Sequence, residues 1–225
     1  EGTAYGLPGN KKFFNRVRFS QIGNPLEADA WQVNIFGKGG FADAPTAETI
    51  IDVKFFKNTL IVFFEKSTWQ LRFVGEYGTP FLFERISSDF GSESTFSSLL
   101  FDQGVLAIGD RAIISATSTT VNRIDEAIPD QVFDIRNVLA GPERVQGVRD
   151  YQRELAFWSF TNSDIDTATQ KFPSSVLVYN YRNSTFAIFR DNVTAFGTLQ
   201  PATGITWDST TVLWDDTVVT WDTVQ

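Results

Sequence analysis

The chain has 225 residues, is rich in aromatic side chains with 22 Phe and 6 Trp, and carries a formal net charge of -8. It contains neither Cys nor His, which excludes disulfides, thiolate zinc sites and catalytic triads built on His. The negative charge argues against a surface that binds nucleic acid by neutralising phosphates, although DNA could still pass along an acidic wall that repels it.

Short runs of aromatic and β-branched residues, bounded by turn residues, predict strands along the whole chain. The segment 13–20 is expected to form one long strand or a strand pair in a partial unit. Two strands at 52–56 and 59–63 follow, separated by a polar turn. Strands at 68–73 and 81–86, with a turn at 77–80 between them, complete a predicted four-stranded meander.

A repeat of this strand, turn and strand pattern is the main signal in the sequence. An offset of 95 residues pairs Val53 with Val148 and Leu60 with Leu155, which keeps the apolar positions in register. Residues 105–115 have the same form and provide a third copy. Units of roughly 40 to 50 residues with four short strands are typical of propeller blades.

The last unit contains a second hairpin, formed by residues 175–181 and 185–189, after a polar loop at 162–174. We therefore predict an all-β fold with a β-propeller-like array of four-stranded antiparallel blades. The predicted domain is 1–199, with units at approximately 11–48 (partial), 49–98, 99–144 and 145–199. Three units and a part are few for closure, which leaves open whether the chain is a fragment of a larger propeller.

The tail at 200–225 has a period of its own, because Trp207, Trp214 and Trp221 are each followed by Asp at seven-residue intervals. The intervening Thr, Val, Ser and Asp favour strands and turns over a helical coiled coil. We expect these three Trp residues to contact a partner or copies in neighbouring subunits. The alternative is a poorly ordered acidic tail.

Two polar segments resemble known loops. Residues 162–166 resemble the start of a calcium loop but lack its later Gly and Glu, so a solvated loop is expected. Residues 88–96 resemble the Asp-box turn of sialidase propellers, with the Thr and the aromatic residue out of step. Such a turn is structural and carries no catalysis.

The remaining charged residues are expected on the surface. Carboxylates that could in principle form a glycosidase pair are Glu65, Glu76, Glu84, Asp102, Asp110, Asp125 and Glu126. The neighbours Asp110 and Arg111, and likewise Glu143 and Arg144, are interpreted as turn and surface ion pairs. We predict no catalytic residue, no metal site and no cofactor. No apolar run reaches the roughly 18 residues of a membrane span, so none is predicted.

Two segments resemble tailed-bacteriophage virion proteins. Residues 16–25, followed by Trp31, resemble a strand reading R-V-x-[FWY]-S that leads into G-[DN]-P and a later aromatic residue. Residues 61–69 are similar to the L-x-I-F-T-E-x-S-x-W strands of those proteins. Repeated Trp-Asp pairs also occur among phage structural chains.

The resemblance implies a propeller-bearing component of the phage tail or neck, such as a tail nozzle or head-tail stabilisation protein. Such proteins assemble as homo-oligomeric rings around the DNA exit channel, beside other tail or neck proteins. The implied function is structural and non-enzymatic, the location is the virion, and DNA is met only by passage.

Two alternatives stay open. A carbohydrate-binding or glycan-cleaving propeller, such as a receptor-binding protein, would need Trp31, Trp69 or Trp158 exposed in a concave site beside carboxylates. A cellular interaction propeller is the other, but the seven-residue Trp-Asp period does not match the roughly 40-residue period of WD repeats.

Overall fold

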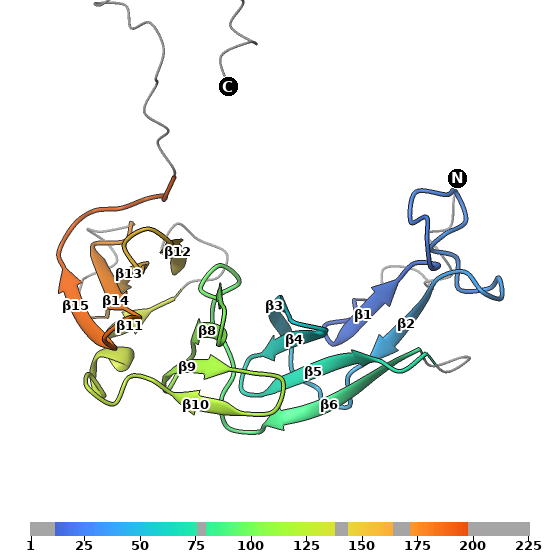
Figure 1. The fold of residues 1–225 in the computed structure, drawn as a ribbon, viewed down its shortest axis with the longest axis horizontal. Helices are drawn as coiled ribbons and strands as arrows, with labels where there is room; N and C mark the ends of the chain where they lie inside the picture. Colours follow the sequence, from blue (N-terminus) through green and yellow to red (C-terminus); the bar gives the residue numbers. More distant parts are fainter. Residues whose placement is uncertain (1–11, 76–79, 138–143, 164–171, 198–225) are drawn as a thin grey trace, which may run out of the picture. The chain divides into compact units, whose positions relative to one another are not determined.

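The computed structural model describes residues 12–75, 80–137, 144–163 and 172–197, which form antiparallel β-sheets without an α-helix (Figure 1). The predicted all-β fold is therefore confirmed. The chain divides into two compact units, 1–195 and 196–225, and every described strand belongs to the first. The Trp-Asp tail lies outside the described residues.

Four groups of strands follow one another along the chain, and we name them in that order. The N-terminal ribbon pairs β1 (Arg16–Phe19) with β2 (Gly40–Asp43). The first sheet is the meander β3 (Ile50–Phe56), β4 (Thr59–Phe64), β5 (Thr68–Phe73) and β6 (Phe81–Ser87). The middle sheet contains β7 (Leu99–Phe101), β8 (Gly104–Ile108), β9 (Ile113–Ala116) and β10 (Val121–Arg123).

The last sheet contains β12 (Gln146–Asp150), β13 (Leu155–Asn162), β14 (Ser175–Asn180) and β15 (Thr185–Phe189). A short strand, β11 (Ile135–Arg136), pairs with the end of β13 and follows a 3-10 helix, η2 (Gln131–Asp134). The strands predicted at 68–73 and 81–86, and the late hairpin, are thus confirmed. The strand predicted at 13–20 is shorter and pairs with β2 instead of with a neighbouring segment.

The middle sheet is buried on both faces, which explains why β8 is apolar throughout. Successive side chains of a strand point to opposite faces. Val105 and Ala107 accordingly pack toward the first sheet, and Leu106 and Ile108 pack toward the last sheet. All five residues of β8 are buried. A continuous apolar run is the expected signature of a strand covered on both sides.

The 95-residue repeat is present in the strand pairing. Val53 pairs with Val62 in the first sheet, and Val148 pairs with Phe157 in the last sheet. The two hairpins nevertheless face each other, because Phe63 and its counterpart Trp158 both point toward the middle sheet from opposite sides. Blades related by one repeated rotation would not face each other in this way.

The connections between the sheets differ in length and in what they pack against. Only residues 88–98 join the first sheet to the middle sheet, whereas residues 124–145 lie between β10 and β12. Val132, Ile135 and Val145 of that longer connection join the core between the middle and last sheets. The third copy of the repeat, residues 105–115, forms β8 and β9. In the middle sheet β8 is an inner strand, because β7 pairs with it, whereas its counterparts β3 and β12 are edge strands. Each of the three sheets contains a four-stranded antiparallel meander, but their arrangement as propeller blades is not confirmed.

Candidate functional site: a buried serine linker between three sheets

The segment that joins β6 to β7, residues 88–98, is the most polar buried part of the described chain, and we call it the serine linker. Ser92, Ser94 and Ser97 are fully buried and Ser98 is nearly so. Gly91 lets the linker reach the end of β4, because a Cβ atom there would collide with the Phe64 carbonyl oxygen. The Ser92 amide then donates a hydrogen bond to that oxygen at 2.9 Å.

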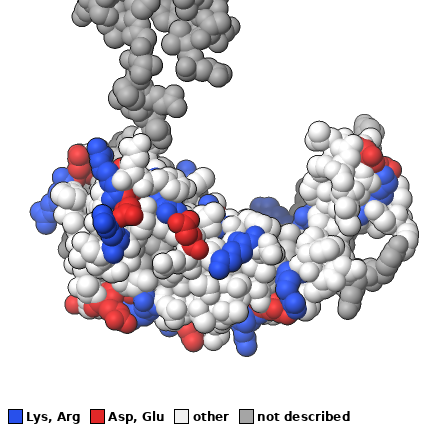
Figure 2. All heavy atoms as spheres, in the orientation of Figure 1, with Lys and Arg blue, Asp and Glu red and all other residues white. Residues whose placement is uncertain are grey.

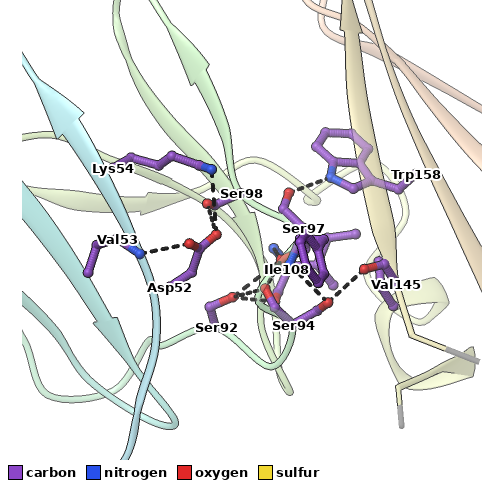
Figure 3. Close-up of polar contacts among 11 residues, drawn as sticks. Asp52, Val53, Lys54, Ser92, Ser94, Ser97, Ser98, Ile108, Val145 and Trp158 are labelled. Atoms are coloured by element: carbon purple, nitrogen blue, oxygen red, sulfur yellow. Dashed lines mark hydrogen bonds and ion pairs between the residues drawn. The ribbon is translucent and has the colours of Figure 1, made fainter. Parts of the chain in front are cut away.

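On one side the serine linker is fastened to the first sheet (Figure 3). The Ser98 hydroxyl donates to the Asp52 carboxylate, and the Lys54 ammonium lies 3.8 Å from the same carboxylate. The Thr68 hydroxyl donates to the Phe90 carbonyl oxygen at 2.7 Å. Asp52 occupies a position of β3 at which the alternation of the strand directs the side chain toward the interior. Its carboxylate therefore contacts the serine linker and is largely shielded from water.

On the other side the serine linker is fastened to the last sheet. The Ser94 hydroxyl donates to the Val145 carbonyl oxygen at 2.6 Å, and the Trp158 indole N–H donates to the Ser97 carbonyl oxygen at 2.7 Å (Figure 3). The Gly147 amide donates to the Phe96 carbonyl oxygen at 2.8 Å. Gly147 has no room for a Cβ atom, which would lie 2.7 Å from the Trp158 indole nitrogen.

The middle sheet and the connection after β10 complete the contacts. The Glu93 amide donates to the Ile108 carbonyl oxygen at 3.1 Å, and the Asn137 side chain donates to the Glu93 carbonyl oxygen at 2.7 Å. Asn137 also accepts a hydrogen bond from the Val145 amide at 3.1 Å. A buried polar group is costly unless it is paired, and these polar groups are paired with protein atoms.

Two carboxyl groups at the serine linker have shifted pKa values. Burial raises the pKa of Asp52, and the Ser98 hydrogen bond and the Lys54 charge oppose that rise. Burial raises the pKa of Glu93 as well, with a further contribution from the nearby charge of Asp110. A raised pKa means that burying the ionised form costs free energy.

The chemistry available at the linker is that of a structural joint. The Ser94 and Ser98 hydroxyls donate to a carbonyl oxygen and to a carboxylate, and both side chains are buried by the packed sheets. The sequence contains no His that could act as a base toward them. Sequence reasoning treated residues 88–96 as a structural turn but missed Asp52, whose only signal was a carboxylate at an inward position of an apolar strand.

Most of the candidate carboxylates that the structure describes form ion pairs. Glu84 lies 2.8 Å from Arg72, Asp110 lies 3.5 Å from Arg111, and the Asp102 side chain is 95% exposed. Glu76 and Glu143 lie outside the described residues, as do Asp164, Ile165 and Asp166 of the calcium-like loop.

The expectation that Asp125 belongs to the surface is wrong. Its side chain is fully buried, and both of its oxygens accept hydrogen bonds from the Arg123 guanidinium at 3.0 Å. Asp125 is the second residue of the connection after β10, and the chain turns there because the Ile128 amide donates a hydrogen bond to the Asp125 carbonyl oxygen. The bidentate pairing compensates the buried charge.

Two of the three Trp residues on which a glycan-binding site would depend are buried. Trp158 is fully buried and Trp69 is 6% exposed, and both belong to the cores between sheets. Trp31 is half-buried and donates its indole N–H to the Pro25 carbonyl oxygen at 2.9 Å. The predicted partner contacts Trp207, Trp214 and Trp221 lie outside the described residues.

Comparison with protein-family models and with curated proteins gave no match to this chain. Within the described ranges, no three His, Cys, Asp or Glu side chains are grouped so that they could hold a metal ion. The same ranges contain no helix with the length and hydropathy of a membrane span. Acidic and basic side chains are interspersed over the face in Figure 2, with wide uncharged areas between them.

Proposed function

We propose that this chain is a non-enzymatic structural component of a phage virion, and that it forms part of a ring at the tail or head-tail junction through which DNA passes. The carrying observation is the serine linker, whose buried polar groups fasten three sheets together. A buried segment whose polar groups are paired with protein atoms supports a structural role for this part of the chain. The described core therefore has a structural role in this proposal.

The two segments that resemble phage virion proteins support the proposal, because several of their residues pack in the interior of the fold. Residues 61–69 form the hairpin of β4 and β5, and in them Phe63, Phe64 and Trp69 are buried between sheets. Residues 16–25 supply β1 and the start of the loop after it. The likeness to virion proteins thus involves positions that pack.

Part of the predicted propeller plan is retained in the proposal. An offset of 52 residues relates Phe56 and Ile61 of the first sheet to Ile108 and Ile113 of the middle sheet. In both sheets these side chains face the sheet that follows in the chain. We propose that these two sheets stack as successive blades and that the last sheet departs from that sense.

Imaging and native mass spectrometry of the purified full-length chain test this function. We expect one closed ring with a central opening and subunit interfaces above about 2000 Å² per pair, the size typical of obligate assemblies. We also expect no retention of double-stranded DNA at low salt, because the net charge is -8. A monodisperse monomer at all protein concentrations would contradict the proposal.

A further inference from the structure

The strand β15 is an outer edge of the last sheet, because among the described strands it pairs only with β14 (Figure 1). All of its residues except Phe186 are exposed. An edge strand presents main-chain N–H and C=O groups that can pair with a further strand. β15 therefore offers a place for strand addition, provided that nothing in its sequence prevents it.

The other described edges of the three sheets carry features that hinder such pairing. β3 and β6 each contain charged residues and a register shift, and β12 contains Arg149 and Asp150. β7, β10 and β11 have only two or three residues each. Charges, bulges and short length are the usual means by which proteins protect sheet edges. β15 is a regularly paired run of Thr, Phe, Ala, Ile and Phe and has none of these features.

Charged side chains lie only beyond the two ends of β15. Arg190 follows the strand directly and is exposed, and Asp191 lies one residue further from the strand. In the preceding turn, the Arg182 side chain is 81% exposed and lies 3.6 Å from Glu154. The edge therefore fits a strand of five uncharged residues that has a carboxylate at the end facing Arg190.

The tail contains a run of this kind, which lies outside the described residues. Residues 217–221 are Thr, Val, Val, Thr and Trp, and Asp216 and Asp222 bracket them. Thr, Val and Trp are residues that favour strands. When the run is aligned five on five with β15, Arg190 faces Asp216 in an antiparallel pairing and Asp222 in a parallel one. The tail run therefore matches the β15 edge in length and in charge in either direction.

We propose that residues 217–221 of one copy of this chain add as a strand to the β15 edge of a neighbouring copy. The inference rests on the proposed ring and identifies one contact that builds it. Residues 190–216 separate β15 from the run, and a chain of that length spans about 90 Å when fully extended, which is enough to reach a neighbouring copy. The tail and the edge are different surfaces, so the contact is head to tail, and contacts of this type generate rings.

Two variants of the full chain test the pairing by native mass spectrometry and amide hydrogen exchange. Ala187→Lys places a charge in the middle of the exposed edge, and Val219→Pro removes a main-chain donor from the tail run. Ala195→Lys and Val212→Pro are the controls, because they make the same changes outside the edge and the run. We expect the first two variants to be monomers in which the β15 amides exchange at least about tenfold faster than in the wild-type assembly. Both controls should behave as the wild type does.

Mixing the two variants tests pairing between copies, because Ala187→Lys keeps an intact tail run and Val219→Pro keeps an intact edge. Their mixture should form a one-to-one complex that does not grow further. A wild-type ring in which the β15 amides exchange quickly overturns the inference and leaves the proposed function intact. A wild-type monomer in which these amides exchange slowly would show that the edge is covered within one copy, and it would overturn both the inference and the proposed ring.

A peptide with the sequence of residues 215–223 tests main-chain pairing on the Val219→Pro variant, whose edge is expected to be uncovered. Each edge of a strand presents the N–H groups of alternate residues. Two modified peptides are therefore compared, one N-methylated at Val218 and Thr220 and the other at Val219 and Trp221. We expect the unmodified peptide and one modified peptide to slow amide exchange in β15, and the other modified peptide to have no effect. Binding of both modified peptides, or of neither, overturns strand addition.

Discussion

Phe63 and Phe55 lie on neighbouring strands of the first sheet, yet Phe63 is fully buried and Phe55 is 64% exposed. The inward face that carries Phe63 is covered by the middle sheet and closed at its polar end by the serine linker. Among the described residues, the two-stranded ribbon covers part of the outward face that carries Phe55. The comparison separates aromatic side chains that are buried between two sheets from those that remain largely exposed on the opposite face of the same sheet.

The largest difference is expected from two matched truncations. Phe63→Ala should lower the free energy of unfolding by about 3 to 5 kcal/mol, because it opens a cavity between two sheets. Phe55→Ala should cost under about 1 kcal/mol in the isolated chain, because its side chain is mostly in water. Urea unfolding of both variants at low protein concentration measures this. Equal losses would show that the outward face is already covered within the chain.

The close approach of the serine linker to the end of β4 is tested with Gly91→Ala. The new methyl group would meet the Phe64 carbonyl oxygen and the Glu65 backbone, neither of which can rotate away. We expect a loss of roughly 1 to 3 kcal/mol, the usual cost of overpacking. Gly197→Ala is the control, because nothing lies within 4 Å of the corresponding methyl position. Equal stability of the two variants in thermal or urea unfolding would contradict the close approach of the serine linker to the end of β4.

The polar fastening to the last sheet is tested with Ser94→Ala. The change removes the hydroxyl that donates to the Val145 carbonyl oxygen and leaves that buried oxygen without this partner. We expect a cost of about 1 to 3 kcal/mol, against a change within about 0.5 kcal/mol for the exposed Ser88→Ala. Retention of full stability in Ser94→Ala would mean that the joint between the serine linker and the last sheet is not a source of stability.

The smallest effect concerns the pH dependence of Asp52. Because burial raises its pKa, the folded chain binds a proton at Asp52 more readily than the unfolded chain does. The resulting stabilisation is complete below the unfolded pKa and is lost as pH rises through the folded pKa. The stability of the wild type relative to Asp52→Asn should therefore increase as pH is lowered from about 7 toward about 4.

The comparison with the variant is needed because other carboxyl groups shift differently. A hydrogen bond from Arg16 lowers the pKa of Asp43, and hydrogen bonds from Gln21 and Lys38 lower that of Glu27. Glu93 shifts in the same direction as Asp52. Only the difference between wild type and Asp52→Asn isolates Asp52, and a difference that falls on acidification would contradict its buried, costly charge.

The strands could be predicted from the sequence, because the alternation of buried and exposed side chains and the preferences of turn residues depend on only a few neighbouring residues. The pairing of Val53 with Val62 and of Val148 with Phe157 follows from such patterns. The orientation of one sheet toward another depends on distant contacts. Nothing within the repeat reveals that Phe63 and Trp158 approach the middle sheet from opposite sides.

The candidate site was less predictable than the strands. Ser94 belongs to the segment 88–96 that was predicted as a structural turn, and its burial depends on the three sheets that meet around it. Asp125 read as surface charge for the same reason, since its burial and its pairing with Arg123 arise only when the chain turns at this position. The exposure of apolar residues such as Phe55 could not be predicted either, because they follow the same alternation along the strand as buried apolar residues do.

The contrast between the two faces of the first sheet is tested most directly by thiol labelling, because the chain contains no Cys of its own. Phe55→Cys, Ile61→Cys and Phe133→Cys would each provide one thiol for reaction with a maleimide. We expect the Phe55 and Phe133 variants to react quickly, because these side chains are 64% and 63% exposed, and the Ile61 variant to stay unreactive, because that side chain is fully buried. Slow labelling of Phe55→Cys, or labelling of Ile61→Cys as fast as that of Phe55→Cys, would contradict the contrast between the exposed and the buried face.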